Sequence, residues 1–188
     1  MLVAAATLLL HLTPVQAQRA TENEAPASTK RYGIETNLVW PFVPGINIWQ
    51  LKSATVIHQG RQQSGEFILG ALYRRTLQDE NAAVHREIGG ILGYRHFFYK
   101  GLHAEFNTHL TAAAALQNKI DQRDYRSFAF TTELYAGYRF EMARPRRVSF
   151  YLTPQVGLGR NLYAALGPES ETGSGIFPIA SLLAGIRF

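Results

Sequence analysis

The stretch of sequence that decides the fold is Ile176-Phe177-Pro178-Ile179-Ala180-Ser181-Leu182-Leu183-Ala184-Gly185-Ile186-Arg187-Phe188. Counted back from Phe188, every second residue is apolar, while the residues between them are mixed. A period of two is typical of a β-strand, because successive side chains point to opposite faces. The stretch therefore predicts a strand with one wholly apolar face.

The same alternation recurs seven more times upstream. It is clearest at 148–162 and least regular at 46–58. The alanine-rich run at 112–116 could be helical, but the alternation around it favours a strand. We predict eight strands, at about 32–40, 46–58, 65–77, 85–98, 102–115, 127–141, 148–162 and 176–188.

The composition favours a closed barrel in a membrane. The 188 residues include no cysteine, and no second apolar run approaches the roughly 20 residues that a membrane helix needs. Backbone groups in lipid must be satisfied internally, which leaves a closed β-barrel as the spanning structure. An even number of strands agrees with this class. We predict an all-β fold, an eight-stranded antiparallel up-and-down transmembrane β-barrel, over residues 32–188.

The first residues predict export. Met1 to Leu12 is an apolar run interrupted only by Thr7 and His11, and the small residues Val15 and Ala17 suit a signal peptidase. No Lys or Arg precedes the run, which departs from the usual signal pattern. We predict a signal peptide at 1–17, a flexible periplasmic leader at 18–31, and a location in the outer membrane of a Gram-negative bacterium.

The loop lengths predict an orientation. With the N-terminus in the periplasm, short turns near 59–63, 99–101 and 142–147 face the periplasm, and longer loops near 78–84, 117–126 and 163–175 face outward. The net charge is +5, and the turn at 142–147 is basic; we expect this turn to face the acidic phosphates of lipid rather than to bind nucleic acid. The turn at 99–101 is expected to use Gly101 for a positive φ.

The strand faces opposite to the apolar ones carry acids and bases together. An eight-stranded barrel is only wide enough for side chains to fill it, and buried charges are tolerated when they are paired. We therefore predict that a polar network plugs the lumen. Its members are Glu35, Glu66, Arg74, Glu87, Arg95, His103, Glu105, His109, Glu133, Arg139 and Glu141.

A metal site is the weaker interpretation of the same residues. His103, Glu105 and His109 share one strand face, but residues two apart in a strand are separated by about 6.6 Å. One ion could bind them only if a neighbouring strand contributed a ligand. We predict no metal and no cofactor.

The chain resembles small, functionally uncharacterised eight-stranded outer-membrane β-barrels. The resemblance rests on the closing strand with its terminal aromatic and on the hairpin Tyr94-Arg95-His96-Phe97-Phe98-Tyr99-Lys100-Gly101-Leu102-His103-Ala104-Glu105-Phe106. It implies that Phe188 is part of the signal read by the barrel-assembly machinery. It also implies contact with outer-membrane lipid and lipopolysaccharide, and we expect a monomer that binds no nucleic acid.

We predict a structural or surface-interaction role and no catalytic residue. The first alternative is a lipid-modifying enzyme, because some small outer-membrane barrels are lipid A deacylases or palmitoyltransferases. The deacylases place a His and a Ser two residues apart on a lipid-facing strand, whereas the corresponding neighbours of His96 are Tyr94 and Phe98. The second alternative is a narrow channel for small solutes. A soluble lipocalin-like barrel would need its apolar residues to point inward.

Overall fold

A computed structural model describes residues 31–60, 63–77, 82–143, 148–164 and 175–188. Nearly all of them lie in antiparallel strands, as the alternation predicts. The one other element is a 3₁₀ turn, η1, at Trp40–Phe42. The strands are β1 (Tyr32–Asn37), β2 (Ile46–Gln59), β3 (Ser64–Leu77), β4 (Ala82–Tyr99), β5 (Leu102–Asn118), β6 (Tyr125–Tyr138), β7 (Phe140–Ala143), β8 (Ser149–Ala164) and β9 (Ile176–Arg187).

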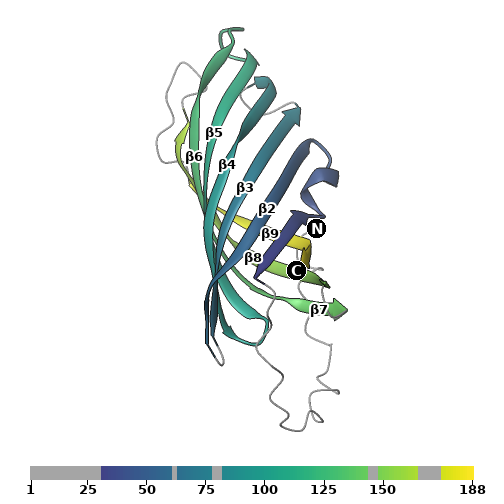
Figure 1. Ribbon diagram of the computed structural model, residues 1–188. Helices are drawn as coiled ribbons and strands as arrows, with labels where there is room; N and C mark the ends of the chain where they lie inside the picture. Colours follow the sequence, from purple (N-terminus) through teal and green to yellow (C-terminus); the bar gives the residue numbers. More distant parts are fainter. Residues whose placement is uncertain (1–30, 61–62, 78–81, 144–147, 165–174) are drawn as a thin grey trace.

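The strands form one closed ring (Figure 1). Each strand from β1 to β5 pairs with the next in sequence, β7 and β9 both pair with β8, and β9 pairs with β1. The pairing of β6 with β8 closes the circle. The ring leaves no long free edge, so the main backbone hydrogen-bonding groups are satisfied within the sheet. No helix in the described part of the chain is long and apolar enough to cross a membrane.

The sixth predicted strand, 127–141, is divided in the structure. Arg139 separates β6 from β7, and both segments pair with β8. The backbone N–H of Arg139 donates instead to the carbonyl oxygen of Gly101, at 2.9 Å. The described residues therefore contain nine strand segments where the sequence predicts eight strands.

The first strand is shorter than predicted, because Asn37 draws the chain into a turn. Its side-chain oxygen accepts hydrogen bonds from the backbone N–H of Val39, at 2.9 Å, and of Trp40, at 3.1 Å. Pro41 follows inside η1. The prediction of a strand to residue 40 was wrong, since an asparagine side chain competes with the ladder for these donors.

The hairpin between β4 and β5 also corrects the sequence analysis. The positive φ lies at Lys100, at 50°, and not at Gly101. Glycine is required at 101 for a different reason, because a Cβ there would lie 2.2 Å from the carbonyl oxygen of Arg139.

At the opposite end of the ring, Tyr125 donates a hydrogen bond to Asp121 and lowers the pKa of that carboxyl.

The strands are tilted relative to the axis of the ring. A row of cross-strand partners that starts at Ile34 returns to β9 at Ile176, whereas Ile34 itself pairs with Ile186; the offset along β9, from residue 176 to residue 186, is 10 residues, as expected for tilted strands. The row runs through Ile34, Ser53, Leu69, Leu92, Thr108, Thr132, Arg160 and Ile176.

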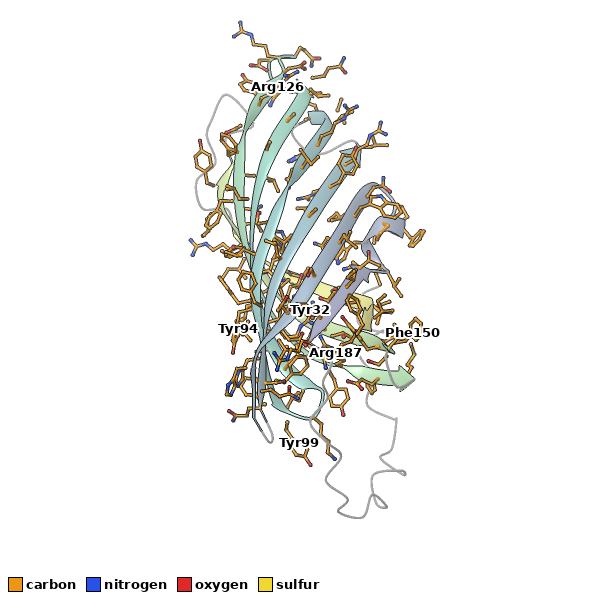
Figure 2. All side chains as sticks on the ribbon, in the orientation of Figure 1. Tyr32, Tyr94, Tyr99, Arg126, Phe150 and Arg187 are labelled. Carbon is orange, nitrogen blue, oxygen red and sulfur yellow. The ribbon has the colours of Figure 1, made fainter. Side chains whose placement is uncertain are left out.

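The burial pattern is inverted relative to a water-soluble protein. Large apolar side chains cover the outer face, with Leu110 60% and Leu134 57% exposed (Figure 2). Charged side chains fill the interior, and Glu35 and Arg95 are 0% exposed. An exposed apolar surface this extensive marks an interaction surface, because isolated soluble proteins rarely carry one.

Candidate functional site

Arg95 of β4 lies at the centre of the ring and binds carboxylates from three other strands. Its Nη2 donates to Oε1 of Glu35 at 2.6 Å, its Nη1 to Oε2 of Glu66 at 3.1 Å, and its Nε to Oε2 of Glu105 at 2.5 Å. All four side chains are 1% exposed or less. One guanidinium thus ties together β1, β3, β4 and β5 across the interior of the ring.

Three more cations complete this group. Lys52 Nζ lies 2.8 Å from Glu105, Arg139 donates two bonds to Glu66 at 2.7 and 2.8 Å, and Arg187 also binds Glu66. The group includes one neutral donor, Tyr151, whose hydroxyl donates to Glu35 at 3.1 Å. We call this group the plug. It consists of Glu35, Lys52, Glu66, Arg95, Glu105, Arg139, Tyr151 and Arg187.

The plug is packed as well as paired. The guanidinium of Arg139 lies over the rings of Tyr151, at 4.4 Å, and of Phe97, at 4.6 Å. The amide of Asn107 donates to Glu105 at 2.7 Å. Buried charges held by several hydrogen bonds and ring contacts fix one arrangement of the surrounding strands.

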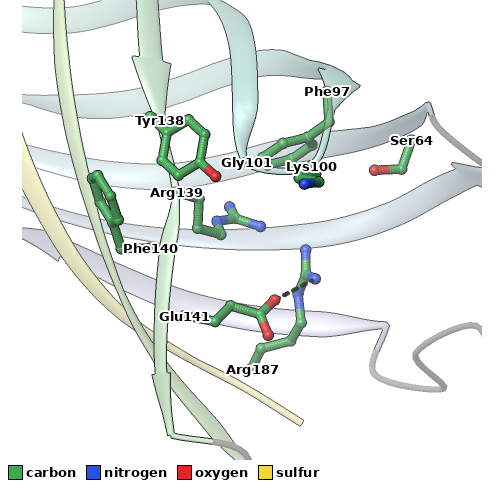
Figure 3. Close-up of a pocket in the computed structure, with 9 residues that line it drawn as sticks. All are labelled: Ser64, Phe97, Lys100, Gly101, Tyr138, Arg139, Phe140, Glu141 and Arg187. Carbon is green, nitrogen blue, oxygen red and sulfur yellow. Dashed lines mark ion pairs between the residues drawn. The ribbon is translucent and has the colours of Figure 1, made fainter. Parts of the chain in front are cut away.

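Below the plug, at the end with the short turns, the ring opens into a cavity of about 550 Å³ (Figure 3). Arg139 and Arg187 extend into it from the plug, and Lys100 lies at its edge. Glu141 lies 3.7 Å from Arg187 and is more exposed than the plug carboxylates. The cavity therefore has a mixed wall in which cations exceed the single carboxylate.

Above the plug lies a second cavity, of about 260 Å³, which we call the vestibule. Its polar wall carries the ion pair of Arg74 with Glu87, at 3.5 Å, and the contact of His109 Nε2 with Oε2 of Glu133, at 3.2 Å. Its opposite wall is apolar and includes Trp40, Phe177 and Ile179. The vestibule thus has one wall of ionic groups and one of aromatic and aliphatic groups.

The predicted network residues do not form one cluster. The plug contains Glu35, Glu66, Arg95, Glu105 and Arg139, and the vestibule contains Arg74, Glu87, His109 and Glu133. His103 stands apart, with Nδ1 3.1 Å from the carbonyl oxygen of Gly101 and Nε2 3.4 Å from Gln155. Glu141 lies at the inner cavity.

Sequence analysis missed Lys52, Tyr151 and Arg187 as members of the plug. Lys52 lies on β2, where the register shifts between Val56 and His58 and breaks the alternation. Tyr151 and Arg187 lie on mixed faces whose polar character was visible in the sequence. Their alternation with apolar neighbours would have been sufficient to place both inside.

The described residues form no arrangement that supports a metal site or a deacylase-type His–Ser pair. Among the residues that the structure describes, no three His, Cys, Asp or Glu side chains are arranged to hold a metal ion. His96 lies on the outer face with Nδ1 3.0 Å from the hydroxyl of Tyr94 and its ring against Phe98. These neighbours supply no serine for a deacylase-type pair.

Comparison of the chain with models of protein families, with curated proteins and with solved structures gives no match.

Proposed function

We propose that this protein is an integral outer-membrane β-barrel with a plugged lumen and a structural or surface-interaction role. The observation that carries the proposal is the inverted burial, with charges inside and large apolar side chains outside. In water this surface would cost free energy, whereas in lipid it is the expected outer face of a barrel. In this proposal β6 and β7 act as one strand, which makes the barrel eight-stranded.

The plug supports a structural role over a channel. Arg95 and its partners bridge strands on several sides of the ring and leave their side chains fully buried. Ions crossing the lumen would have to separate these pairs, which costs several kcal/mol for each unpaired buried charge.

The proposal extends to location and partners. The protein would reside in the outer membrane of a Gram-negative bacterium as a monomer, after removal of residues 1–17. Its apolar face would contact membrane lipid and lipopolysaccharide, and Phe188 would contribute to recognition by the barrel-assembly machinery.

A refolding experiment tests the proposal. The chain from residue 18 onward is refolded into lipid vesicles, and its gel migration in SDS is compared before and after boiling. We expect a faster-migrating species that boiling abolishes, as for a closed barrel. Persistent aggregation in vesicles, with a monomeric species obtained only in water, would contradict the membrane assignment.

Conductance then separates the plugged barrel from a channel. We expect the refolded protein to leave the conductance of a planar bilayer unchanged. Discrete, voltage-independent steps in the conductance would instead identify the protein as a channel. Lipid A from cells with and without the gene, compared by mass spectrometry, tests the enzyme alternative, and we expect identical profiles.

A further inference from the structure

Three exposed arginines lie in one cross-strand row on the outer face of the ring. The register pairs Arg75 of β3 with Arg86 of β4, Arg86 with Ala114 of β5, and Ala114 with Arg126 of β6. Arg126 lies at the end of the ring opposite to Tyr99 (Figure 2). Within the described residues, none of the three arginines makes an ion pair.

Arg75 and Arg86 are direct cross-strand neighbours. Side chains in this relation have Cβ atoms about 5 Å apart, and like charges placed there repel. An anion between the two guanidinium groups would remove this repulsion and accept bidentate hydrogen bonds from both. Arg126 lies two strand spacings from Arg86, about 10 Å, with only the methyl group of Ala114 between them. It can therefore reach a second anionic group of the same ligand.

The row directly below is apolar. It runs from Tyr73 through Ile88 and Ala112 to Phe128. Ala112 and Ala114 are small residues between larger neighbours, and a groove of about 530 Å³ lies over them. Its lining includes Arg86 and Arg126 as well as Ile88 and Phe128, so charge and apolar surface are continuous.

The outward-facing arginines gather toward one end of the ring, as expected if they contact the headgroups of a single membrane leaflet. The outward-facing arginines of the described strands are Arg75, Arg86, Arg126 and Arg160, and all lie toward the end with the longer loops. The outer face at the other end presents aromatic side chains, including Phe98, Phe140 and Phe150.

From this we propose that the Arg75–Arg86–Arg126 row binds a glycolipid of the lipid A type in the outer leaflet, one that carries two phosphate groups. The Arg75–Arg86 pair holds one phosphate, Arg126 reaches the other, and an acyl chain lies in the groove over Ala112. This inference rests on the proposed function, because it requires the barrel to be in a bilayer with its longer loops outward.

Native mass spectrometry of the detergent-refolded chain tests the site. The probes are bisphosphorylated lipid A, monophosphorylated lipid A and phosphatidylglycerol, with inorganic phosphate as competitor. We expect bisphosphorylated lipid A to bind about tenfold more tightly than either other lipid, and inorganic phosphate not to displace it. Equal binding of phosphatidylglycerol, or displacement by inorganic phosphate, would overturn the proposal without any variant.

Variants then locate the site. Arg75→Gln combined with Arg86→Gln should weaken lipid A binding about tenfold, and Arg126→Gln should abolish the preference for the bisphosphorylated form. Arg160→Gln is the matched control, because Arg160 is exposed on the same outer face but pairs with Thr132 and Ile176. An equal loss in the control would show a general charge effect and overturn the site. If the wild-type protein forms no heat-modifiable species, the proposed membrane barrel itself is refuted, independently of the lipid site.

Discussion

The two halves of the lumen hold their charges in different ways. In the plug, the side chain of Arg95 is 0% exposed and contacts three carboxylates. In the vestibule, the side chain of Arg74 is 34% exposed, and its ion pair with Glu87 is longer, at 3.5 Å. Polar and apolar residues alternate in the same way along the strands of both halves. Burial and pairing, rather than residue type, therefore decide which charges stabilise the fold. We expect the plug to stabilise the barrel and the vestibule to remain accessible to solutes.

Removing the central cation should have the largest effect. Arg95→Met leaves three buried carboxylates with one cation fewer, and we expect the free energy of unfolding to fall by about 3–5 kcal/mol. Urea titration of the vesicle-refolded protein measures it. Arg74→Met is the matched control and should cost about 1 kcal/mol or less, because that pair is partly solvated. Equal losses in the two variants would contradict the division of the lumen.

The outer face provides an independent measure of depth. Leu134→Arg places a charge near the middle of the apolar band and should lower the free energy of unfolding in vesicles by about 2–4 kcal/mol. Leu152→Arg is the control, because Leu152 pairs with Phe140 close to the short-turn end and should cost about 1 kcal/mol or less. If both variants refold with unchanged stability, the outer face does not meet lipid.

The sequence predicted the strands well because alternation is a local property. It placed Glu35, Arg95 and Glu105 on inward faces for the same reason. It could not predict which charges meet, since Arg139 and Glu66 are 73 residues apart and their contact depends on the register of every strand between them. Local irregularities account for the other differences. The bulge in β2 breaks the alternation from which Lys52 could have been assigned to the interior, and the Asn37 turn places Trp40 in the wall of the vestibule.

A pair of tyrosine–glutamate contacts tests the same comparison with a smaller change. Tyr151 donates to Glu35 in the plug at 3.1 Å, and Tyr135 donates to Glu133 in the vestibule at 3.0 Å. Tyr151→Phe should lower the free energy of unfolding by about 1.5–3 kcal/mol, because Glu35 loses a donor that water cannot replace. Tyr135→Phe should cost about 1 kcal/mol or less, since Glu133 borders the cavity. A larger loss for Tyr135→Phe would reverse the assignment of the two halves.

Single cysteine substitutions measure the access of a water-soluble reagent to the lumen and should leave the stability nearly unchanged. The chain has no cysteine, so a single Thr→Cys substitution gives one reactive thiol. Thr131 lines the vestibule, whereas Thr153 is 0% exposed on the inner face of β8. A small charged thiol reagent added outside sealed vesicles should label Thr131→Cys and leave Thr153→Cys unmodified until the protein is unfolded, with the labelled fraction read by mass spectrometry. Thiol reactivity also depends on the local pKa, so each labelling rate is divided by the rate of the same variant after unfolding, which leaves access as the difference. Labelling of both residues at one rate would mean that solvent passes the plug, and the lumen would then be a channel.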